Sequence, residues 1–137
     1  MTYLLDTNVL SAQRRQKHNP TAYNWVKEQE PESLYISLIT IGEIRAGIER
    51  IQSKDPIQAE ALENWLLDTK FFYSDQILGI DEAVIERWGC LGNCQKQHPI
   101  DALMAATALE HDFTLVTRNV KHVVDTGVQL LNPWTND

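Results

Sequence analysis

Three acidic residues, Asp6, Glu43 and Asp101, are each set among apolar or small residues. An ionised carboxylate taken out of water is costly unless a cation meets it, so acids at the ends of core elements predict a shared positive partner. The simplest such partner is a divalent metal ion. Three oxygen donors suit Mg²⁺ or Mn²⁺, with waters and a substrate phosphate completing the shell. Such an ion lowers the pKa of bound water and neutralises charge on a phosphodiester in the transition state.

Each acid also has a plainer interpretation. Asp101 could be an ordinary first-turn acid favoured by the helix dipole, and Asp6 could start an Asx turn with the two residues that follow it. Glu43 could lie on a solvated helix face, although no Lys or Arg stands at the usual pairing distances of three or four residues along its helix. The joint occurrence of the three acids favours the metal site.

The elements that must position these acids alternate between short apolar runs and helical patterns, which predicts an α/β domain with a mostly parallel sheet. Asp81 is placed as a helix N-cap. The predicted strands are residues 3–5, 34–36, 77–80, 115–117 and 128–131, and the predicted helices are residues 21–29, 37–51, 56–69, 81–91 and 100–111.

The acids fall at informative places in this order. Asp6 directly follows the first strand, and the carboxyl ends of parallel strands form the ligand crevice of open sheets. Asp101 lies in the first turn of the last long helix, after Pro99 at the expected N1 position. Residues 102–109 are apolar nearly all round, which predicts a buried central helix.

Composition predicts one compact domain over the 137 residues, with 43% hydrophobic and 23% charged residues and no apolar run long enough for a membrane span. The first residues have no basic region of the kind that opens a signal peptide, so we expect a cytoplasmic protein. A net charge of −7 argues against broad, non-specific nucleic-acid binding. Any such partner must be met locally, through metal and a few basic side chains.

Two smaller clusters contain residues that could bind a metal or an anionic partner. Cys90, Cys94 and His98 share a four-residue spacing, but Gly89, Gly92 and Pro99 break the helix needed to align them for Zn²⁺, so we expect free thiols. The basic run at residues 14–18 is usually a solvated helix end; an RNA-facing or partner-facing patch is the alternative.

These motifs carry a resemblance. LLDTNVLS at residues 4–11, ISLITIGEIRAG at 36–47, DALMAATA at 101–108 and LVTRN at 115–119, followed by Gly127-Val128 and LNPW at 131–134, are similar to the PIN-domain toxins of the bacterial VapC/FitB type. The match spans nearly the whole chain in order. It implies a single PIN domain over residues 1–137, with three α/β/α layers around a central, mostly parallel sheet of about five strands.

The function that the resemblance implies is a metal-dependent endoribonuclease acting as the toxin of a toxin–antitoxin pair. Asp6, Glu43 and Asp101 would be catalytic and would bind Mg²⁺ or Mn²⁺. Asn8, Thr117 and Asn119 would support the site. The implied partners are an RNA substrate, a small DNA-binding antitoxin whose tail covers the site, and a second copy in a homodimer, with no membrane.

Two departures from the family pattern matter. A fourth acid commonly follows the Thr-Arg-Asn run in relatives, whereas this chain has His122 there, which we add to the supporting residues. The stretch from Gly89 to Pro99 is also short. Both features favour, as the alternative, a catalytically weakened PIN scaffold that binds RNA or a protein. A phosphoaspartyl enzyme or receiver domain is a third reading, but the second acid that either would need near Asp6 is absent.

Overall fold

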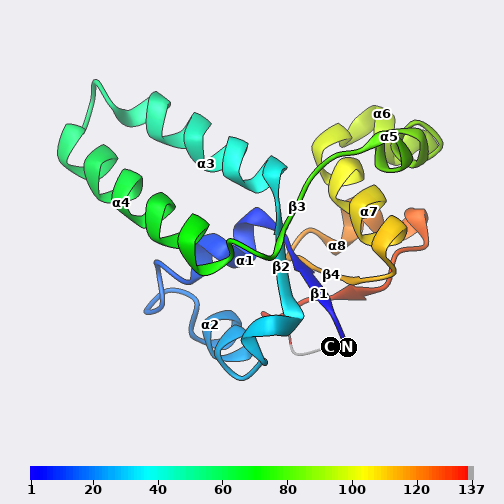
Figure 1. Cartoon of the computed structure of the whole chain (residues 1–137), viewed down its shortest axis with the longest axis horizontal. Helices are drawn as coiled ribbons and strands as arrows, with labels where there is room; N and C mark the ends of the chain where they lie inside the picture. Colours follow the sequence, from blue (N-terminus) through cyan, green and yellow to red (C-terminus); the bar gives the residue numbers. More distant parts are fainter. Residues whose placement is uncertain (136–137) are drawn as a thin grey trace.

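A computed structural model describes residues 1–135 of the chain (Figure 1). Its strands are short and its helices lie between them, as the alternating sequence pattern predicts. The elements, with η for a 3-10 helix, are β1 (Tyr3–Leu5), α1 (Thr7–Ala12), α2 (Pro20–Lys27), η1 (Pro31–Ser33), β2 (Leu34–Ser37), α3 (Leu38–Ile51), α4 (Pro56–Phe72), β3 (Ile77–Leu78), α5 (Glu82–Gly89), α6 (Gly92–Gln97), α7 (Pro99–His111), β4 (Thr114–Val116), α8 (Val120–Val123), η2 (Val124–Thr126) and β5 (Leu130–Leu131).

The five strands form one sheet in the order β3-β2-β1-β4-β5, and every neighbouring pair is parallel. The predicted fold class is therefore confirmed. The chain builds outward from β1 to β3 on one side and then crosses to β4 on the other side of β1. In open parallel sheets this reversal opens a crevice at the carboxyl ends of the two central strands. Here those strands are β1 and β4.

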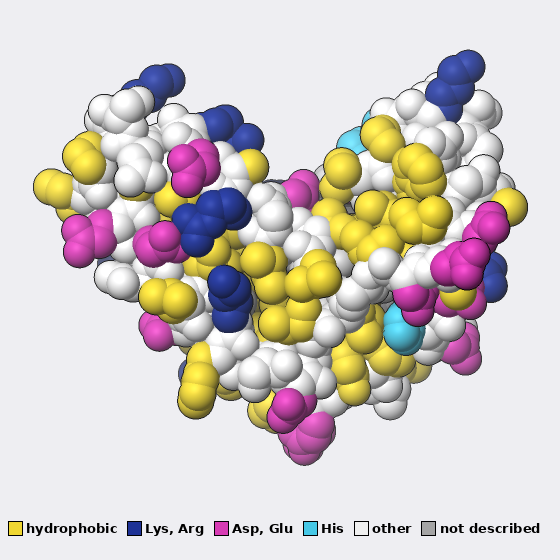
Figure 2. Space-filling view, turned by 45° about the horizontal axis from the view of Figure 1, so that its top comes forward, with side chains coloured by type: hydrophobic (Ala, Val, Ile, Leu, Met, Phe, Trp, Pro, Cys, Tyr) yellow, Lys and Arg dark blue, Asp and Glu magenta, His cyan; other side chains and the backbone are white. Residues whose placement is uncertain are grey.

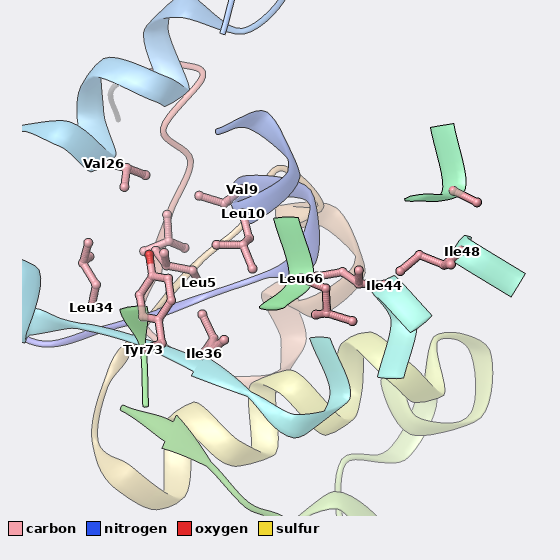
Figure 3. Packing of buried hydrophobic residues seen from close by; sticks show 12 residues of the cluster. Leu5, Val9, Leu10, Val26, Leu34, Ile36, Ile44, Ile48, Leu66 and Tyr73 are labelled. Atoms are coloured by element: carbon pink, nitrogen blue, oxygen red, sulfur yellow. The ribbon is translucent and has the colours of Figure 1, made fainter. Parts of the chain in front are cut away.

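Successive side chains of a strand point to opposite faces of a sheet, and this alternation divides the core into two layers. Leu5 and Val116 belong to a cluster with residues of α1, α2, α3 and α4, part of which is drawn in Figure 3. Leu4 and Leu115 belong to a second cluster with residues of α6, α7 and α8. The sheet therefore lies between two helical layers.

Three helices, α3, α4 and α7, determine the shape of the molecule around the crevice. α7 carries Ala102, Ala105, Ala106 and Ala108 fully buried, as expected for a central helix packed closely on the sheet. α3 and α4 form a hairpin on the opposite side of the sheet (Figure 1). An Arg45–Glu63 ion pair with two hydrogen bonds of 2.9 and 2.6 Å joins α3 to α4.

The sequence prediction was wrong where elements are very short. It missed α1, α6 and α8, which have six, six and four residues, because so few residues show no helical periodicity. It treated residues 89–99 as helix-breaking, whereas residues 92–97 form α6. Gly92 adopts φ +57 and allows the chain to turn between α5 and α6. Within residues 1–135, no helix is long and apolar enough to cross a membrane.

Candidate active site

Asp6 lies at the carboxyl end of β1, in the crevice between β1 and β4. Its backbone N–H donates to Val116 O at 2.9 Å, which fixes it beside β4. Its side chain caps α1, with Oδ1 accepting from Thr7 N at 2.7 Å. Oδ2 accepts from the Thr117 hydroxyl at 2.6 Å, and this hydroxyl accepts in turn from Asn119 N at 3.0 Å. The carboxylate is only 6% exposed and is held from two strand ends.

The charge of Asp6 is poorly compensated despite these hydrogen bonds. Burial raises the pKa of Asp6 to about 6, the bonds from Thr117 and Thr7 lower it, and the negative charges of Asp101 and Glu43 raise it again. The three acids therefore share one electrostatic environment. None of the ion pairs found within residues 1–135 includes Asp6 or Glu43.

Glu43 extends from α3 toward the start of α1. Its Oε1 accepts from the Thr7 hydroxyl at 2.5 Å, and that hydroxyl is 3.0 Å from the buried Thr40 hydroxyl. Glu43 is exposed as a residue, as the plainer interpretation expected, yet it is tied to the residue next to Asp6. Thr7 is a site residue that the sequence reasoning did not select. Its signal was its position directly after Asp6.

Asp101 lies in the first turn of α7, with Pro99 in the first positions, as predicted. Its Oδ2 is 2.7 Å from His122 Nδ1 on α8. The His122 ring stacks on His98 with centroids 3.9 Å apart and an interplanar angle of 5°. His122 therefore does not simply face solvent on a turn. His98 joins the cluster although the sequence reasoning had considered it only together with the cysteines.

The remaining predicted residues surround the crevice. Asn119 contributes its backbone N–H to Thr117, as described above. Asn8 Oδ1 accepts a long hydrogen bond of 3.4 Å from Arg118 N. Asn8 thus hydrogen-bonds to a backbone group and Asn119 to a hydroxyl group. Neither bond involves Asp6, Glu43 or Asp101.

A cavity of about 720 Å³ is lined by Glu43 and by Thr7, the residue next to Asp6. Its lining also includes Asn8 and four arginines: Arg14, Arg15, Arg50 and Arg118. Two of these guanidinium groups lie over tryptophan rings, at 5.6 Å for Arg14 on Trp65 and 4.6 Å for Arg118 on Trp134. The basic run at residues 14–18 thus contributes two arginines to the wall of this cavity.

A second, largely apolar cavity of about 460 Å³ shares Trp65 with the arginine-lined one. It lies between α1, α2 and α4, and its wall includes Leu10, Val26, Phe72 and Tyr73. A notch separates the side formed by α3 and α4, which carries Glu43, from that formed by α5, α6 and α7, which carries Asp101 (Figure 2). Hydrophobic side chains line the notch, and an acidic side chain is visible at its floor.

The cysteines are free, as predicted. Cys90 is exposed, and Cys94 is buried with its Sγ donating to His122 O at 3.0 Å. Burial, with the nearby charges of Asp101 and Asp125, raises the pKa of the Cys94 thiol. The helix is broken as predicted, because Cys90 lies between α5 and α6 and His98 follows α6. Neither thiol joins the cluster of groups that lie close enough to share an ion.

The fold and this constellation at the β1/β4 crevice define an α/β protein with an acidic site, and sequence comparison gives its family. Residues 3–124 match the PIN domain, and the chain belongs to the PIN-domain family. It is 32% identical to the plasmid stability protein StbB of Pseudomonas syringae, over 96% of this chain and 97% of that protein. It is 31% identical to toxin FitB of Neisseria gonorrhoeae, with 96% and 97% covered.

Further relatives extend this group. The VapC ribonuclease Y4jK of Sinorhizobium fredii is 28% identical, with 96% of both chains covered. Among solved structures, FitAcB from Neisseria gonorrhoeae superposes with a TM-score of 0.80 at 31% identity, covering 97% of this chain and 99% of that one. A toxin–antitoxin complex from Klebsiella pneumoniae gives 0.70 at 26%, covering 96% and 98%. The predicted resemblance to VapC/FitB toxins is confirmed.

Proposed function

We propose that this chain, as a single PIN domain, is a metal-dependent endoribonuclease and the toxin of a toxin–antitoxin pair that acts in the cytoplasm. One observation carries the proposal: the buried carboxylate of Asp6 lies in the field of Asp101 and Glu43 without a cationic partner among the ion pairs of residues 1–135. Relatives that carry the names toxin and ribonuclease support it.

The donor set fits a divalent cation. Asp6, Glu43 and Asp101 offer carboxylate oxygens, the donors that Mg²⁺ and Mn²⁺ prefer. A cation held there would compensate the charge of Asp6, whose pKa is raised mainly by burial and further by repulsion from Asp101 and Glu43. When bound, the ion supplies an activated water and neutralises charge on the phosphodiester. Thr117 and Thr7 orient the Asp6 oxygens through their hydrogen bonds, so these oxygens need not reorganise to meet the ion.

The arginine-lined cavity supplies the place for the RNA backbone. Guanidinium groups bind phosphate oxygens through paired, charge-assisted hydrogen bonds. Arg14, Arg15, Arg50 and Arg118 line the same cavity as Glu43, so a strand bound along them would present a phosphodiester to the acids. The net charge of −7 opposes RNA binding on the rest of the surface. RNA binding at this cavity is compatible with that charge, because four arginines are gathered there.

The antitoxin partner is supported by the two adjoining cavities. An extended tail could place apolar side chains in the cavity formed by Leu10, Val26 and Tyr73, pass Trp65, and reach the acids. There an arginine of the tail would make charge-assisted hydrogen bonds with the carboxylates and exclude the metal. A toxin–antitoxin complex among the similar structures supports a partner of this kind.

The test is RNA cleavage by purified, partner-free protein. We expect single-stranded RNA to be cut with Mg²⁺ or Mn²⁺ and EDTA to abolish cleavage. Asp6→Asn and Asp101→Asn should reduce the rate by orders of magnitude while the protein stays folded, whereas Asp75→Asn, a change at an exposed acid, should not. Full activity of Asp6→Asn would refute the assignment.

The weakened scaffold is kept as a second candidate on one observation: the family's fourth acid is replaced by His122, which binds Asp101 instead of adding a charge. A folded wild-type protein that binds RNA but does not cut it with either metal would favour the scaffold.

A further inference from the structure

His98 and His122 form a cluster with Asp101 of the proposed Mg²⁺ site, and the Mg²⁺ chemistry does not need these two imidazoles. Each offers one ligand atom, and these atoms all lie within 4.8 Å of one another. Imidazole nitrogen is a poor ligand for Mg²⁺ and a good one for Zn²⁺, Co²⁺ and Ni²⁺. We propose that these three side chains form a second cation site, specific for a transition metal of the Zn²⁺ kind, with two imidazoles, one carboxylate and at least one open position.

Geometry supports this ligand set. Ligand atoms at zinc distances of roughly 2.0–2.2 Å are separated by about 3.3 Å at a tetrahedral angle. His122 Nδ1 and Asp101 Oδ2 are 2.7 Å apart, so they need to separate by only about half an ångström to hold an ion between them. The parallel His98 ring lies directly against His122, with its centroid 3.9 Å away, so its nitrogens are near the same point.

The backbone holds the three residues in place. His98 is the C-cap of α6 and directly precedes Pro99, the first residue of α7. The spacing from His98 to Asp101 is therefore fixed by the start of α7, where Pro99 restricts the backbone. The third ligand comes from α8, which packs on α7, and the carbonyl of His122 accepts from Cys94 Sγ at 3.0 Å. The His122 and Asp101 side chains keep 41% and 21% exposure, so an ion can enter from solvent.

Sharing Asp101 gives the second site a consequence. An ion bound to His98, Asp101 and His122 would draw Asp101 away from Asp6 and Glu43. Zn²⁺ should therefore inhibit Mg²⁺-dependent cleavage. The binding proposal itself does not rest on the proposed function, since it needs only the three ligands. Asp6→Asn should abolish cleavage and leave Zn²⁺ binding intact, so failure of one proposal is distinguishable from failure of the other.

The experiment is metal titration of the full chain after chelator treatment. Calorimetry should show one Zn²⁺ per chain, retained in excess Mg²⁺, and Co²⁺ should give visible absorption bands of a low-coordinate site. Because loss of even an outer-shell partner commonly costs 10–100-fold in metal affinity, His98→Ala and His122→Ala should each weaken Zn²⁺ binding by at least about 100-fold. His18→Ala and His111→Ala, which change the other two histidines, should bind like wild type.

Circular dichroism should show that each variant is folded. The Mg²⁺-dependent cleavage that His98→Ala retains should no longer be inhibited by Zn²⁺. Unchanged Zn²⁺ affinity in folded His98→Ala and His122→Ala would overturn the site, as would equal loss in the His18 and His111 variants. A Co²⁺ spectrum with a strong thiolate band that disappears in Cys94→Ser would overturn the ligand set in favour of one that includes sulfur.

Discussion

At the scale of single residues, Asp6 shows why hydrogen bonds alone do not neutralise a buried acid. Both of its oxygens accept strong hydrogen bonds, which lower the pKa, yet burial and two neighbouring carboxylates outweigh them and the pKa rises to about 6. The N-cap role expected from the plainer interpretation is also present, because Oδ1 caps α1. Capping accounts for one oxygen only. The bond to the other oxygen comes from Thr117, which directly follows β4 and lies more than a hundred residues away in the sequence.

This shift predicts how metal-free stability depends on pH. The folded-state pKa of Asp6 lies above its ordinary value of 3.8, so the folded protein holds the proton more tightly than the unfolded chain. The free energy of unfolding should therefore fall as pH rises from about 4 to about 6 and stay lower above that, by about 3 kcal/mol in all. Asp6→Asn keeps a neutral group there and should raise the melting temperature at pH 7.5 in EDTA.

Thermal unfolding across pH 4–8 measures this effect. The advantage of Asp6→Asn should shrink toward zero near pH 4, where Asp6 is protonated in the wild type. Added Mg²⁺ should stabilise the wild type at pH 7.5 but have little effect on the variant. A variant that is less stable than wild type at pH 7.5 in EDTA would contradict the inferred charge strain.

His122 predicts the effect of restoring the family's fourth acid. His122→Asp would place a carboxylate next to Asp101, so the site would carry one more negative charge and bind Mg²⁺ more tightly, with faster cleavage. The wild type should be weak with Mg²⁺ and better with Mn²⁺, which accepts nitrogen ligands more readily. Mg²⁺ titration and cleavage rates measure both effects, with His111→Asp as the control. Unchanged Mg²⁺ affinity in folded His122→Asp would show that residue 122 lies outside the metal shell.

At the scale of elements, the sequence predicted what long periodic or apolar runs determine. α7 was predicted from its apolar surface, and Asp81 was predicted as the N-cap of α5, where its Oδ1 accepts from Val84 N. β3 and β5 are shorter than predicted, with two residues each, because apolar residues extend beyond the paired ones, after the end of β3 and before the start of β5. The pairing of Thr7 with Glu43 and the His98–His122 stack could not be predicted, since each joins elements far apart in sequence and depends on how helices pack.

The outer surface of α4 predicts where two copies of the chain meet. Leu67 and Phe71 are 57% and 85% exposed on consecutive turns, and exposed apolar patches of this kind mark interfaces. We propose that this patch forms the homodimer. A Leu67→Ser/Phe71→Ser variant should sediment as a monomer, whereas Ile57→Ser, at an exposed apolar residue near the other end of α4, should stay a dimer. A persisting dimer in the double variant would exclude the patch, and a monomeric wild type would exclude the dimer.

At the scale of the whole molecule, charge is divided between opposing tasks. The chain has 19 acidic and 12 basic residues, so most of its surface repels RNA. Four of the 12 basic residues are arginines that line one cavity, and Glu43 lines the same cavity. Binding is therefore expected only where this cavity and the acids can be used together. This arrangement limits the number of phosphates that the protein neutralises, and that number is measurable.

Salt dependence counts the phosphate contacts. For single strands the logarithm of the binding constant falls with the logarithm of salt concentration at about 0.7 per phosphate neutralised, so four arginines give a slope of up to about 3. Arg15→Gln/Arg50→Gln removes two contacts and should reduce the slope by about 1.4, while Arg14 and Arg118 remain on their tryptophans.

The measurement is RNA binding at several salt concentrations, in the Asp6→Asn background with EDTA so that nothing is cut. Lys54→Gln/Lys96→Gln, which changes two exposed lysines outside the cavity, should leave the slope unchanged. Equal slopes in the arginine variant and wild type would place the RNA backbone elsewhere on the molecule.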